Sequence, residues 1–342
     1  MKVPNPMQLP SGSWNIRMRL NGQEVSITSP TRTECIRKAE KIKADYKAGT
    51  CEHQKLPNDT TLAQAMLQYI LKYEATLSPS TLRQYKSYQK TRFPDYRDLK
   101  LKDIDWQEMI DEELRLKSAK TVRNAWALVS SSLKMIHYPI PSVRLAPPEE
   151  AVVNFLQPDE ITKFCACLKG KNYEIALLLG LHGLRLSEAR ALDWKNVDLK
   201  RNYITVKGAI VRGEDGDVLK KQNKNRTSTR SVPIMIPQLH DALAAVENKN
   251  GPVVIQTSNV LLDDTKRVCN QAGVTECTFH DLRRSFASLC YYLKIPEKQI
   301  QAWGGWKNTE VLQKVYIKLT NIGINESKDV FTRYFSENKD SF

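Results

Sequence analysis

The strongest constraint on this chain is a polar helix start near its C-terminal end. The segment Thr278 to Ala287 carries His280 and Arg283 three residues apart. Apolar residues recur at helical spacing from Phe286 onward, which predicts a helix that starts at these polar residues. The imidazole and the guanidinium then lie about one turn apart on one face, where both can approach one anion. A polar entry into a buried helix is the plainer alternative for this pair alone.

Two further features follow this helix in a fixed order. A short apolar segment, residues 295 to 305, ends in Gly304-Gly305, Trp306 comes next, and Tyr316 lies ten residues later among helically spaced positions. The order His-x-x-Arg, Gly-Gly-Trp, Tyr resembles the second conserved box of the tyrosine recombinases, the phage integrase family. The resemblance implies that Tyr316 is a nucleophile on DNA. Tyr334 is a rival, but its distance from Trp306 does not fit the family pattern.

A second box lies upstream, after a nearly all-apolar helical segment from Ile175 to Leu181. In the run His182-Gly183-Leu184-Arg185-Leu186-Ser187-Glu188, Gly183 permits a tight turn and Ser187 can cap the next helix. Leu-Arg-Leu-Ser-Glu resembles the first box of the same family. There the arginine binds the scissile phosphate and the glutamate supports it, which implies these roles for Arg185 and Glu188. An internal Arg185–Glu188 ion pair is the alternative, and His182 is expected to be structural.

A basic loop is expected between two strand-like regions. Strands are predicted at 203–206 and 209–211, with a turn at 213–216, and the run from Lys220 to Pro233 returns into an apolar strand. The family carries a catalytic lysine on a hairpin before an Arg-x-Val-Pro return, and the spacing to Pro233 fits Lys224 best. Competing candidates, besides a merely solvated loop, are Lys220, Lys221 and Arg226.

The chemistry that the resemblance implies fits these residue types. Two arginines, Arg185 and Arg283, offer planar forked donors to the non-bridging oxygens of a phosphate in its transition state, a task that lysine performs poorly. His280 is the acid/base partner of Tyr316, whose phenol has an ordinary pKa near ~10. Lys224 protonates the departing 5′ hydroxyl. Trp306 replaces a histidine of many relatives, and its indole N–H remains a donor.

Composition agrees with a nucleic-acid partner. The 342 residues include 52 Lys and Arg against 38 Asp and Glu, a net charge of +14, which favours a polyanion. No apolar run is long enough to span a membrane, and the N-terminus has no apolar signal region. The seven cysteines are scattered without framework spacing, which suits a reducing cytoplasm. No phosphate-binding Gly-Lys-Ser/Thr loop and no two-metal carboxylate cluster is present, so no cofactor is expected.

The N-terminal part predicts two DNA-gripping modules. Residues 1–55 read as a hairpin with strands at 14–20 and 24–28, a turn at Asn21-Gly22 and a helix at 33–47, which resembles an arm-type DNA-binding domain. Residues 56–140 read as a helical core-binding domain whose second helix Ser80 caps, with basic residues away from its apolar stripes. Solvated charged faces explain any single basic residue equally well. The candidate DNA contacts are Arg17, Arg19, Arg83, Lys86 and Arg123.

The sequence therefore predicts a multidomain, mainly α protein with small β-sheets. A linker at 141–154 precedes an α+β catalytic domain at 155–342 whose C-terminal tail docks either on its own domain or on a neighbouring copy. The expected activity is site-specific recombination through a 3′-phosphotyrosyl intermediate, in the integrase of a phage, conjugative transposon or other mobile element. Expected partners are double-stranded DNA attachment sites, a homo-tetramer on DNA, and accessory DNA-bending and directionality proteins, in the cytoplasm at the nucleoid. A type IB topoisomerase-like enzyme and an inactive DNA-binding relative are the alternatives.

Overall fold

The computed structural model describes residues 3–20, 23–47, 59–148, 154–220 and 229–306. The chain divides into two compact units, residues 1–72 with 88–146, and residues 73–87 with 147–342. Three predicted features lie outside the described residues. They are the boundary near residue 55, residues 149–153 of the linker and the turn Asn21-Gly22. The predicted domain limits therefore stay predictions.

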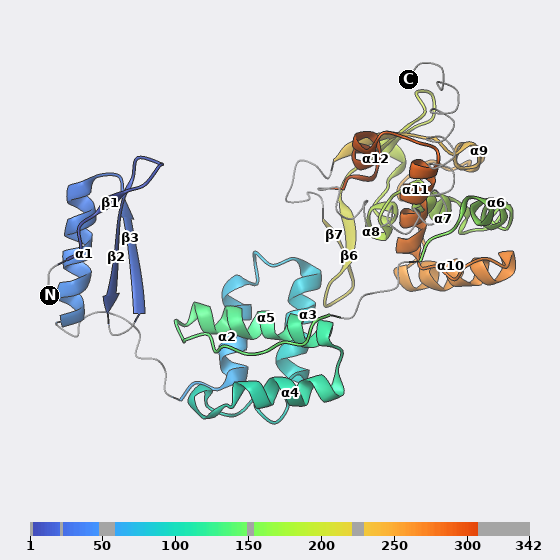
Figure 1. Ribbon diagram of the computed structural model, residues 1–342. Coiled ribbons are helices and arrows are strands. Elements are labelled where there is room, and N and C mark those ends of the chain that lie inside the picture. The colour runs from blue at the N-terminus through green and yellow to red at the C-terminus, as the bar shows by residue number, and fades with distance from the viewer. Residues whose placement is uncertain (1–2, 21–22, 48–58, 149–153, 221–228, 307–342) are drawn as a thin grey trace, which may run out of the picture. The chain divides into compact units, whose positions relative to one another are not determined.

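The N-terminal module is an antiparallel sheet with one helix on one face (Figure 1). Its sheet pairs Trp14 with Ser29 and Ile16 with Ile27, as the alternating pattern predicts. Ile16, Met18 and Ile27 are buried together with Cys35 from the helix, whose thiol donates to the carbonyls of Trp14 and Ile27. The elements are β1 (Met7–Gln8), β2 (Trp14–Leu20), β3 (Gln23–Ser29) and α1 (Arg32–Lys47).

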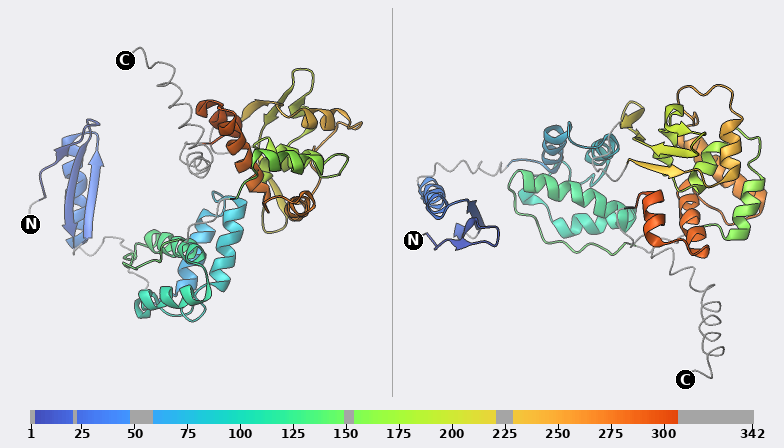
Figure 2. Two further views of the ribbon diagram at one scale, coloured as in Figure 1. Left: turned by 45° about the vertical axis from the view of Figure 1, so that its right-hand side comes forward. Right: turned by 90° about the horizontal axis from the view of Figure 1, so that it is seen from above.

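The next group is helical, as Figure 2 shows from two sides. Its predicted apolar stripes are buried, including Leu62, Met66, Val122 and Leu133. The predicted cap of the second helix is wrong, because that helix begins at Pro79 and the hydroxyl of Ser78, not of Ser80, accepts from the backbone of Thr81 at 3.3 Å. The elements are α2 (Leu62–Tyr73), α3 (Pro79–Thr91), η1 (Leu101–Asp103), α4 (Trp106–Leu116) and α5 (Ala119–Met135).

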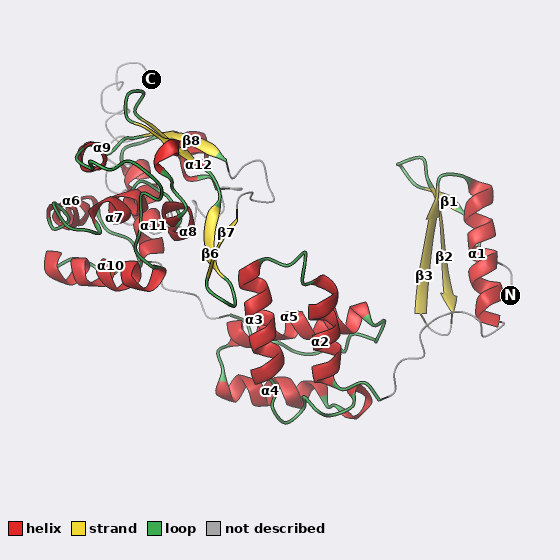
Figure 3. Cartoon of the chain, turned by 180° about the vertical axis from the view of Figure 1, so that it is seen from behind, coloured by secondary structure: helices red, strands yellow, loops and turns green. Residues whose placement is uncertain are grey.

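The C-terminal part packs helices around α7, which is apolar after its first residue, together with small sheets in the order β4-β5-β8 and β6-β7 (Figure 3). Helices α8, α9, α10 and α11 all pack against α7. The elements are α6 (Pro158–Ala166), α7 (Glu174–Leu181), α8 (Leu186–Arg190), η2 (Trp194–Asn196), β4 (Val197–Asp198), β5 (Tyr203–Val206), β6 (Ala209–Arg212), β7 (Asp217–Lys220), β8 (Arg230–Pro233), α9 (Pro237–Ala244), α10 (Ser258–Ala272), α11 (Phe279–Tyr292) and α12 (Glu297–Gly304).

Local chemistry explains the two helix starts that matter for the site. In α11 the carboxylate of Asp281 accepts from the backbone N–H and the hydroxyl of Thr278, at 2.9 and 2.7 Å. In α8 the cap is not Ser187, as the sequence predicted, but Arg185, whose backbone N–H donates to the Glu188 carboxylate at 3.0 Å. A carboxylate in the first helical turn satisfies a backbone N–H and complements the helix dipole in both cases.

Candidate active site

Glu188 is the buried anion at which three structural elements meet. Its carboxylate accepts a hydrogen bond from the guanidinium of Arg185, the N-cap residue of α8, at 2.7 Å. It also accepts two hydrogen bonds from the guanidinium of Arg230 in β8, at 2.9 and 3.2 Å. Its side chain is 3% exposed. Burial by itself raises the pKa of Glu188, but the hydrogen bonds from Arg230 and Arg185 outweigh it and lower the pKa to about 2. Glu188 is therefore ionised at neutral pH and holds both arginines.

Three arginines bind three consecutive carbonyls at the end of α12. Arg230 Nε donates to the carbonyl of Trp303 at 2.7 Å, Arg283 Nη1 to that of Gly304 at 2.6 Å, and Arg185 Nη2 to that of Gly305 at 3.0 Å. Arg283 Nη1 also donates to the carbonyl of Gly183 at 2.6 Å. The carbonyls of Gly304 and Gly305 thereby hold Arg283, from the second sequence box, next to Arg185, from the first.

The glycines are required by close packing. Gly183 has φ +89°, and a Cβ there would lie 2.8 Å from the ring of Phe286, so the tight turn predicted at this position is present. Gly305 has φ +68°, and a Cβ there would lie 2.8 Å from a guanidinium nitrogen of Arg230. A Cβ on Gly304 would overlap the indole of Trp306. Larger residues at these positions would displace the arginines or the ring.

Trp306 covers Arg283. The Cζ atom of Arg283 lies 3.9 Å from the centroid of the indole, in cation–π geometry, and the ring of Phe286 stacks on Trp306 with 6.4 Å between the ring centroids. Arg283 is 1% exposed, and its Nη2 atom is buried without a hydrogen-bond partner among the described residues. Burial, followed by the nearby charge of Arg185, lowers the pKa of Arg283 to about 9, so the guanidinium stays charged at neutral pH.

His280 lies on the exposed side of the start of α11, one turn before Arg283. Desolvation lowers the pKa of His280, the charges of Arg284 and Arg283 lower it further, and only Asp281 opposes them. The imidazole is therefore mainly neutral at neutral pH. A neutral imidazole next to two guanidiniums can accept a proton from a hydroxyl group.

The cluster carries an excess of positive charge. Arg185, Arg230 and Arg283 share the single carboxylate of Glu188, and the side chain of Arg185 remains 40% exposed. The internal Arg185–Glu188 ion pair that was the alternative interpretation does form, but it leaves part of the guanidinium open to solvent. The described part of the cluster therefore has the residues and the charge to bind a phosphate oxygen.

Two of the predicted site residues cannot be placed. Lys224 and Tyr316 lie outside the described residues, as do the competing Lys221 and Arg226, Tyr334 and the whole tail from residue 307. Lys220 ends β7, opposite Ala209. The roles of these residues stay predictions.

The predicted DNA-binding residues differ in their surroundings. Arg17 and Arg83 are exposed, and Arg19 lies on β2 opposite Glu24. Lys86 pairs with Glu74 at 2.8 Å. Arg123 donates to the carbonyls of Ala146 and Leu145 at 2.7 and 3.3 Å, so its guanidinium holds the start of the linker. A DNA contact by Lys86 or Arg123 would have to compete with these bonds.

Sequence reasoning gave no role to Arg230. The Arg-x-Val-Pro motif that contains it served only as a landmark for the loop lysine. The available signal was that Arg230 opens the strand predicted at the end of the basic loop, in the motif Arg-x-Val-Pro. His182 is structural as expected: it is buried, and its Nε2 accepts from the backbone of Met235 at 3.0 Å.

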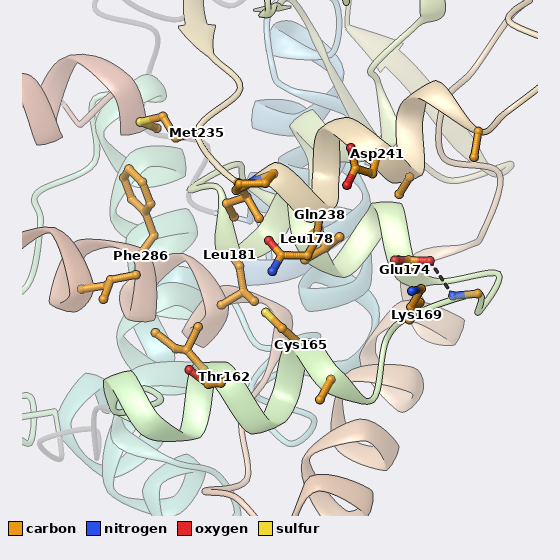
Figure 4. Close-up of a pocket in the computed structure, with 18 residues that line it drawn as sticks. Thr162, Cys165, Lys169, Glu174, Leu178, Leu181, Met235, Gln238, Asp241 and Phe286 are labelled. Carbon is orange, nitrogen blue, oxygen red and sulfur yellow. Dashed lines mark hydrogen bonds between the residues drawn. The ribbon is translucent and has the colours of Figure 1, made fainter.

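A groove of about 840 Å³ lies between α6, α7, α9 and α11 (Figure 4), and none of the described residues that line it is an arginine. Leu178, Leu181, Met235 and Phe286 give it an apolar floor, and Lys169, Glu174 and Asp241 lie at its polar end. Among the described residues, no group of three His, Cys, Asp or Glu side chains is arranged to hold a metal ion. None of the described helices is both long and apolar enough to cross a bilayer.

The C-terminal part of the chain is similar to known proteins. Residues 154–321 match the model of the phage integrase family. A tyrosine recombinase XerC-like protein of Caldanaerobacter subterraneus subsp. tengcongensis is 24% identical over 207 residues, which are 49% of this chain and 52% of that protein. The integrase of Salmonella phage P22 is 22% identical over 185 residues, 51% of this chain and 46% of that protein. The chain thus spans about half the length of these curated relatives.

Solved structures show the same fold. The Tn1549 transposon integrase in complex with transposon right end DNA superposes with a TM-score of 0.63 at 15% identity, over 75% of this chain and 95% of that chain. A lambda integrase tetramer bound to a Holliday junction gives a TM-score of 0.58 at 19% identity, over 90% and 96%. The arginine cluster therefore stands on the fold of these integrases. Through residues 154–321 the chain belongs to the phage integrase family, the tyrosine recombinases.

Proposed function

We propose that the chain is a site-specific DNA recombinase that cuts and rejoins DNA through a 3′-phosphotyrosyl intermediate. The observation that carries the proposal is the fixing of Arg185 and Arg283, one from each family box, on the adjacent carbonyls of Gly305 and Gly304. Both guanidiniums then serve one phosphate, Arg185 from its exposed side and Arg283 through Nη2, which has no hydrogen-bond partner in the described part of the chain.

The proposed reaction assigns each group one task. The phenolic oxygen of Tyr316 attacks phosphorus, its proton passes to neutral His280, and the P–O5′ bond breaks. Arg185 and Arg283 stabilise the negative charge on the non-bridging oxygens, since preorganised donors act most strongly where charge develops. Lys224 donates the proton that the departing O5′ takes up. The indole N–H of Trp306 donates to the same phosphate, and Glu188 keeps Arg185 in place.

Religation reverses these steps. The phosphotyrosyl bond retains the energy of the phosphodiester, so the 5′ hydroxyl of another strand can displace Tyr316 without a nucleotide cofactor or a metal ion. His280 returns the proton to the tyrosine, and Lys224 accepts one from the attacking hydroxyl. Attack by the original strand repairs the cut, whereas attack by a strand of a second site recombines the two.

The substrate that we propose is the pair of double-stranded attachment sites of a phage, conjugative transposon or other mobile element. The net charge of +14 supports a DNA partner, and the likeness to integrases of a phage and a transposon supports the element. Residues 1–55 then bind arm sites and residues 56–140 the core site. The active form is a homo-tetramer on DNA, in the cytoplasm at the nucleoid, with accessory bending and directionality proteins.

The tail beyond residue 306 completes the proposed assembly. Val330, Phe331, Tyr334 and Phe335 recur at helix-like spacing in the sequence. The groove of Figure 4 offers an apolar floor for such a segment. We assign the groove to the tail of a neighbouring copy. A chain truncated after residue 322 should bind one core site as well as the full chain but form no tetrameric complex in a gel-shift assay.

A plasmid that carries two attachment sites in direct repeat tests the activity. The ends of the mobile element that encodes the chain supply these sites. A recombinase resolves the plasmid into two circles, and Tyr316→Phe abolishes the products. Relaxation of any supercoiled plasmid without exchange would instead support the topoisomerase-like alternative, and DNA binding without a cut would support the inactive relative.

A further inference from the structure

Arg230, the first residue of β8, is an arginine to which the proposed reaction gives no task. Its Nη1 and Nη2 atoms donate to the two carboxylate oxygens of Glu188, at 3.2 and 2.9 Å, and its Nε atom donates to the carbonyl of Trp303 at 2.7 Å. Its side chain is 8% exposed. Because the protein binds all three nitrogens and covers the group, Arg230 is not placed to hold a substrate phosphate itself.

Glu188 binds its two arginines in different ways. Arg230 takes both carboxylate oxygens with a fork of two nitrogens, whereas Arg185 reaches only Oε1, with its Nη1 atom at 2.7 Å. The Nη2 atom of Arg185 donates instead to the carbonyl of Gly305 at 3.0 Å, and 40% of this side chain is exposed. A fork of two parallel hydrogen bonds holds a guanidinium more firmly than a single bond. The single bond therefore orients Arg185 but leaves it partly open.

The backbone fixes Arg230 beside this carboxylate. Strand pairing places Arg230 opposite Val206 of β5, and a Cβ on Gly305 would lie 2.8 Å from the Nη1 atom of Arg230. The guanidinium thus packs directly on the turn that follows α12. Burial raises the pKa of Glu188, and among the interactions that lower it to about 2 the hydrogen bond from Arg230 comes first. The carboxylate therefore depends more on Arg230 than on Arg185 for its negative charge.

We propose that Arg230 is a positioning residue: by occupying both carboxylate oxygens of Glu188, it limits Arg185 to a single bond and so leaves the Arg185 guanidinium available to a phosphate oxygen. Without Arg230, both oxygens are open to Arg185, and the nitrogen that now binds Gly305 turns to Glu188 to complete a fork. The buried carboxylate then draws Arg185 away from its exposed position. This inference rests on the proposed function, in which Arg185 binds the phosphate.

A neutral substrate separates this defect from a general one. A methylphosphonate at the cut position has a methyl group in place of one non-bridging oxygen, so it carries no negative charge there. The Coulomb attraction between a guanidinium and this group is far weaker than that to a phosphate. A variant in which Arg185 has withdrawn is therefore slow on the phosphate duplex and little affected on the methylphosphonate duplex. A variant with a distorted fold is slow on both.

The full-length chain is tested on nicked duplexes of both kinds that carry its attachment site. Arg230→Gln should cleave the phosphate duplex about 100-fold more slowly than the unchanged protein, as expected for a misplaced charge-stabilising group. Its loss on the methylphosphonate duplex should be at most about threefold, because that group has no charge to stabilise. Arg201→Gln is the matched control: it removes the same charge from a side chain that is 86% exposed, and it should match the unchanged protein on both duplexes.

Removal of the carboxylate gives a second test. In Glu188→Gln a neutral amide replaces the carboxylate, so no charge draws Arg185 back whether or not Arg230 is present. The double variant Arg230→Gln with Glu188→Gln should therefore cleave the phosphate duplex within about threefold of Glu188→Gln, and faster than Arg230→Gln alone.

Arg230→Lys extends the test to a variant that keeps a charge beside Glu188. An ammonium engages one carboxylate oxygen and leaves the other to Arg185, so cleavage of the phosphate duplex should fall about tenfold, with little loss on the methylphosphonate duplex. Thermal unfolding checks each variant, and Arg230→Lys carries the comparison if Arg230→Gln does not fold. Equal losses on the two duplexes, or a double variant slower than Arg230→Gln, would overturn the inference.

Binding without cleavage keeps this result separate from the proposed function. In the Tyr316→Phe background, the chain should bind the phosphate duplex about tenfold more tightly than the methylphosphonate duplex, and Arg230→Gln should abolish this preference. If the preference is lost in this way but the unchanged protein forms no covalent adduct, the proposed function fails and the inference about Arg230 stands. A preference that survives in Arg230→Gln would contradict the inference even where the unchanged protein forms the adduct.

Discussion

The guanidinium of Arg283 lies against the indole of Trp306, with 3.9 Å between Cζ and the ring centroid, and the same arginine donates to the carbonyl of Gly304. The ring thus excludes water from one side of the guanidinium while the Gly-Gly turn orients it. Charge on a phosphate is stabilised more strongly by donors that are already oriented and shielded from water. This arrangement gives Trp306 two separable contributions, the ring and its N–H.

Substitutions at Trp306 separate these contributions. Trp306→Phe keeps a ring over Arg283 and removes the N–H, so we expect cleavage to fall about tenfold, in line with one lost hydrogen bond to a charged group. Trp306→Ala also removes the ring that lies over Arg283, so cleavage should be slower by a further factor of about ten. Single-turnover cleavage of a nicked substrate measures both. Equal rates for the two variants would show that the ring contributes nothing.

Lysine should not replace the site arginines. Arg185→Lys and Arg283→Lys keep one positive charge but lose the fork that contacts a carbonyl and a phosphate oxygen together, so cleavage should fall about 100-fold or more for each. Arg201→Lys is the control, because the side chain of Arg201 is 86% exposed. DNA affinity should change little in all three variants. Unchanged cleavage by either site variant would contradict the phosphate-binding role.

The lowered pKa of His280 predicts a pH dependence. If the neutral imidazole accepts the proton of Tyr316, cleavage rises with pH through the pKa of His280, and the midpoint of this rise lies below the ordinary value of 6.5. Arg284→Gln removes the strongest nearby charge that lowers this pKa and leaves Asp281 to raise it. The acidic limb of the pH–rate profile should then move to higher pH. A shift to lower pH, or none, would count against His280 as the base.

His182 predicts a change of stability with pH. Burial lowers its pKa from 6.5 to about 4, so the folded state keeps it neutral while the unfolded state takes up a proton. Above pH 6.5 the imidazole is neutral in both the folded and the unfolded state, so it does not make the free energy of unfolding depend on pH. As the pH falls from 6.5 to 4, the free energy of unfolding should decrease by roughly 3 kcal/mol on this account.

His182→Gln should remove this part of the acid sensitivity, because an amide oxygen can accept from Met235 and takes up no proton. Urea unfolding at pH 7.0 and 4.5 measures it, with His240→Gln at a partly exposed position of α9 as control. An acid sensitivity that stays unchanged in His182→Gln and equals that of His240→Gln would contradict this assignment.

The sequence predicted the elements whose pattern is local. Alternation located β2 and β3, helical spacing located α11, and Gly183 itself indicated the tight turn. The predicted N-cap of α8 was wrong. Ser187 is a good N-cap by residue type, but the carboxylate of Glu188 binds the backbone of Arg185 and, from far along the chain, the guanidinium of Arg230. These contacts make Arg185 the cap residue. Arg230 was missed for the same reason, because its hydrogen bonds reach segments far away in the chain.

The most direct test of the account is to identify the residue that becomes linked to DNA. The full-length chain is trapped on a nicked duplex whose short cleaved strand diffuses away, the complex is digested with protease and nuclease, and the nucleotide-bearing peptide is sequenced by mass spectrometry. The account predicts a single modified peptide, with the 3′-phosphate on Tyr316 and the adduct absent in Tyr316→Phe. A phosphate on Tyr334 or on a serine, or an adduct that persists in Tyr316→Phe, would contradict it.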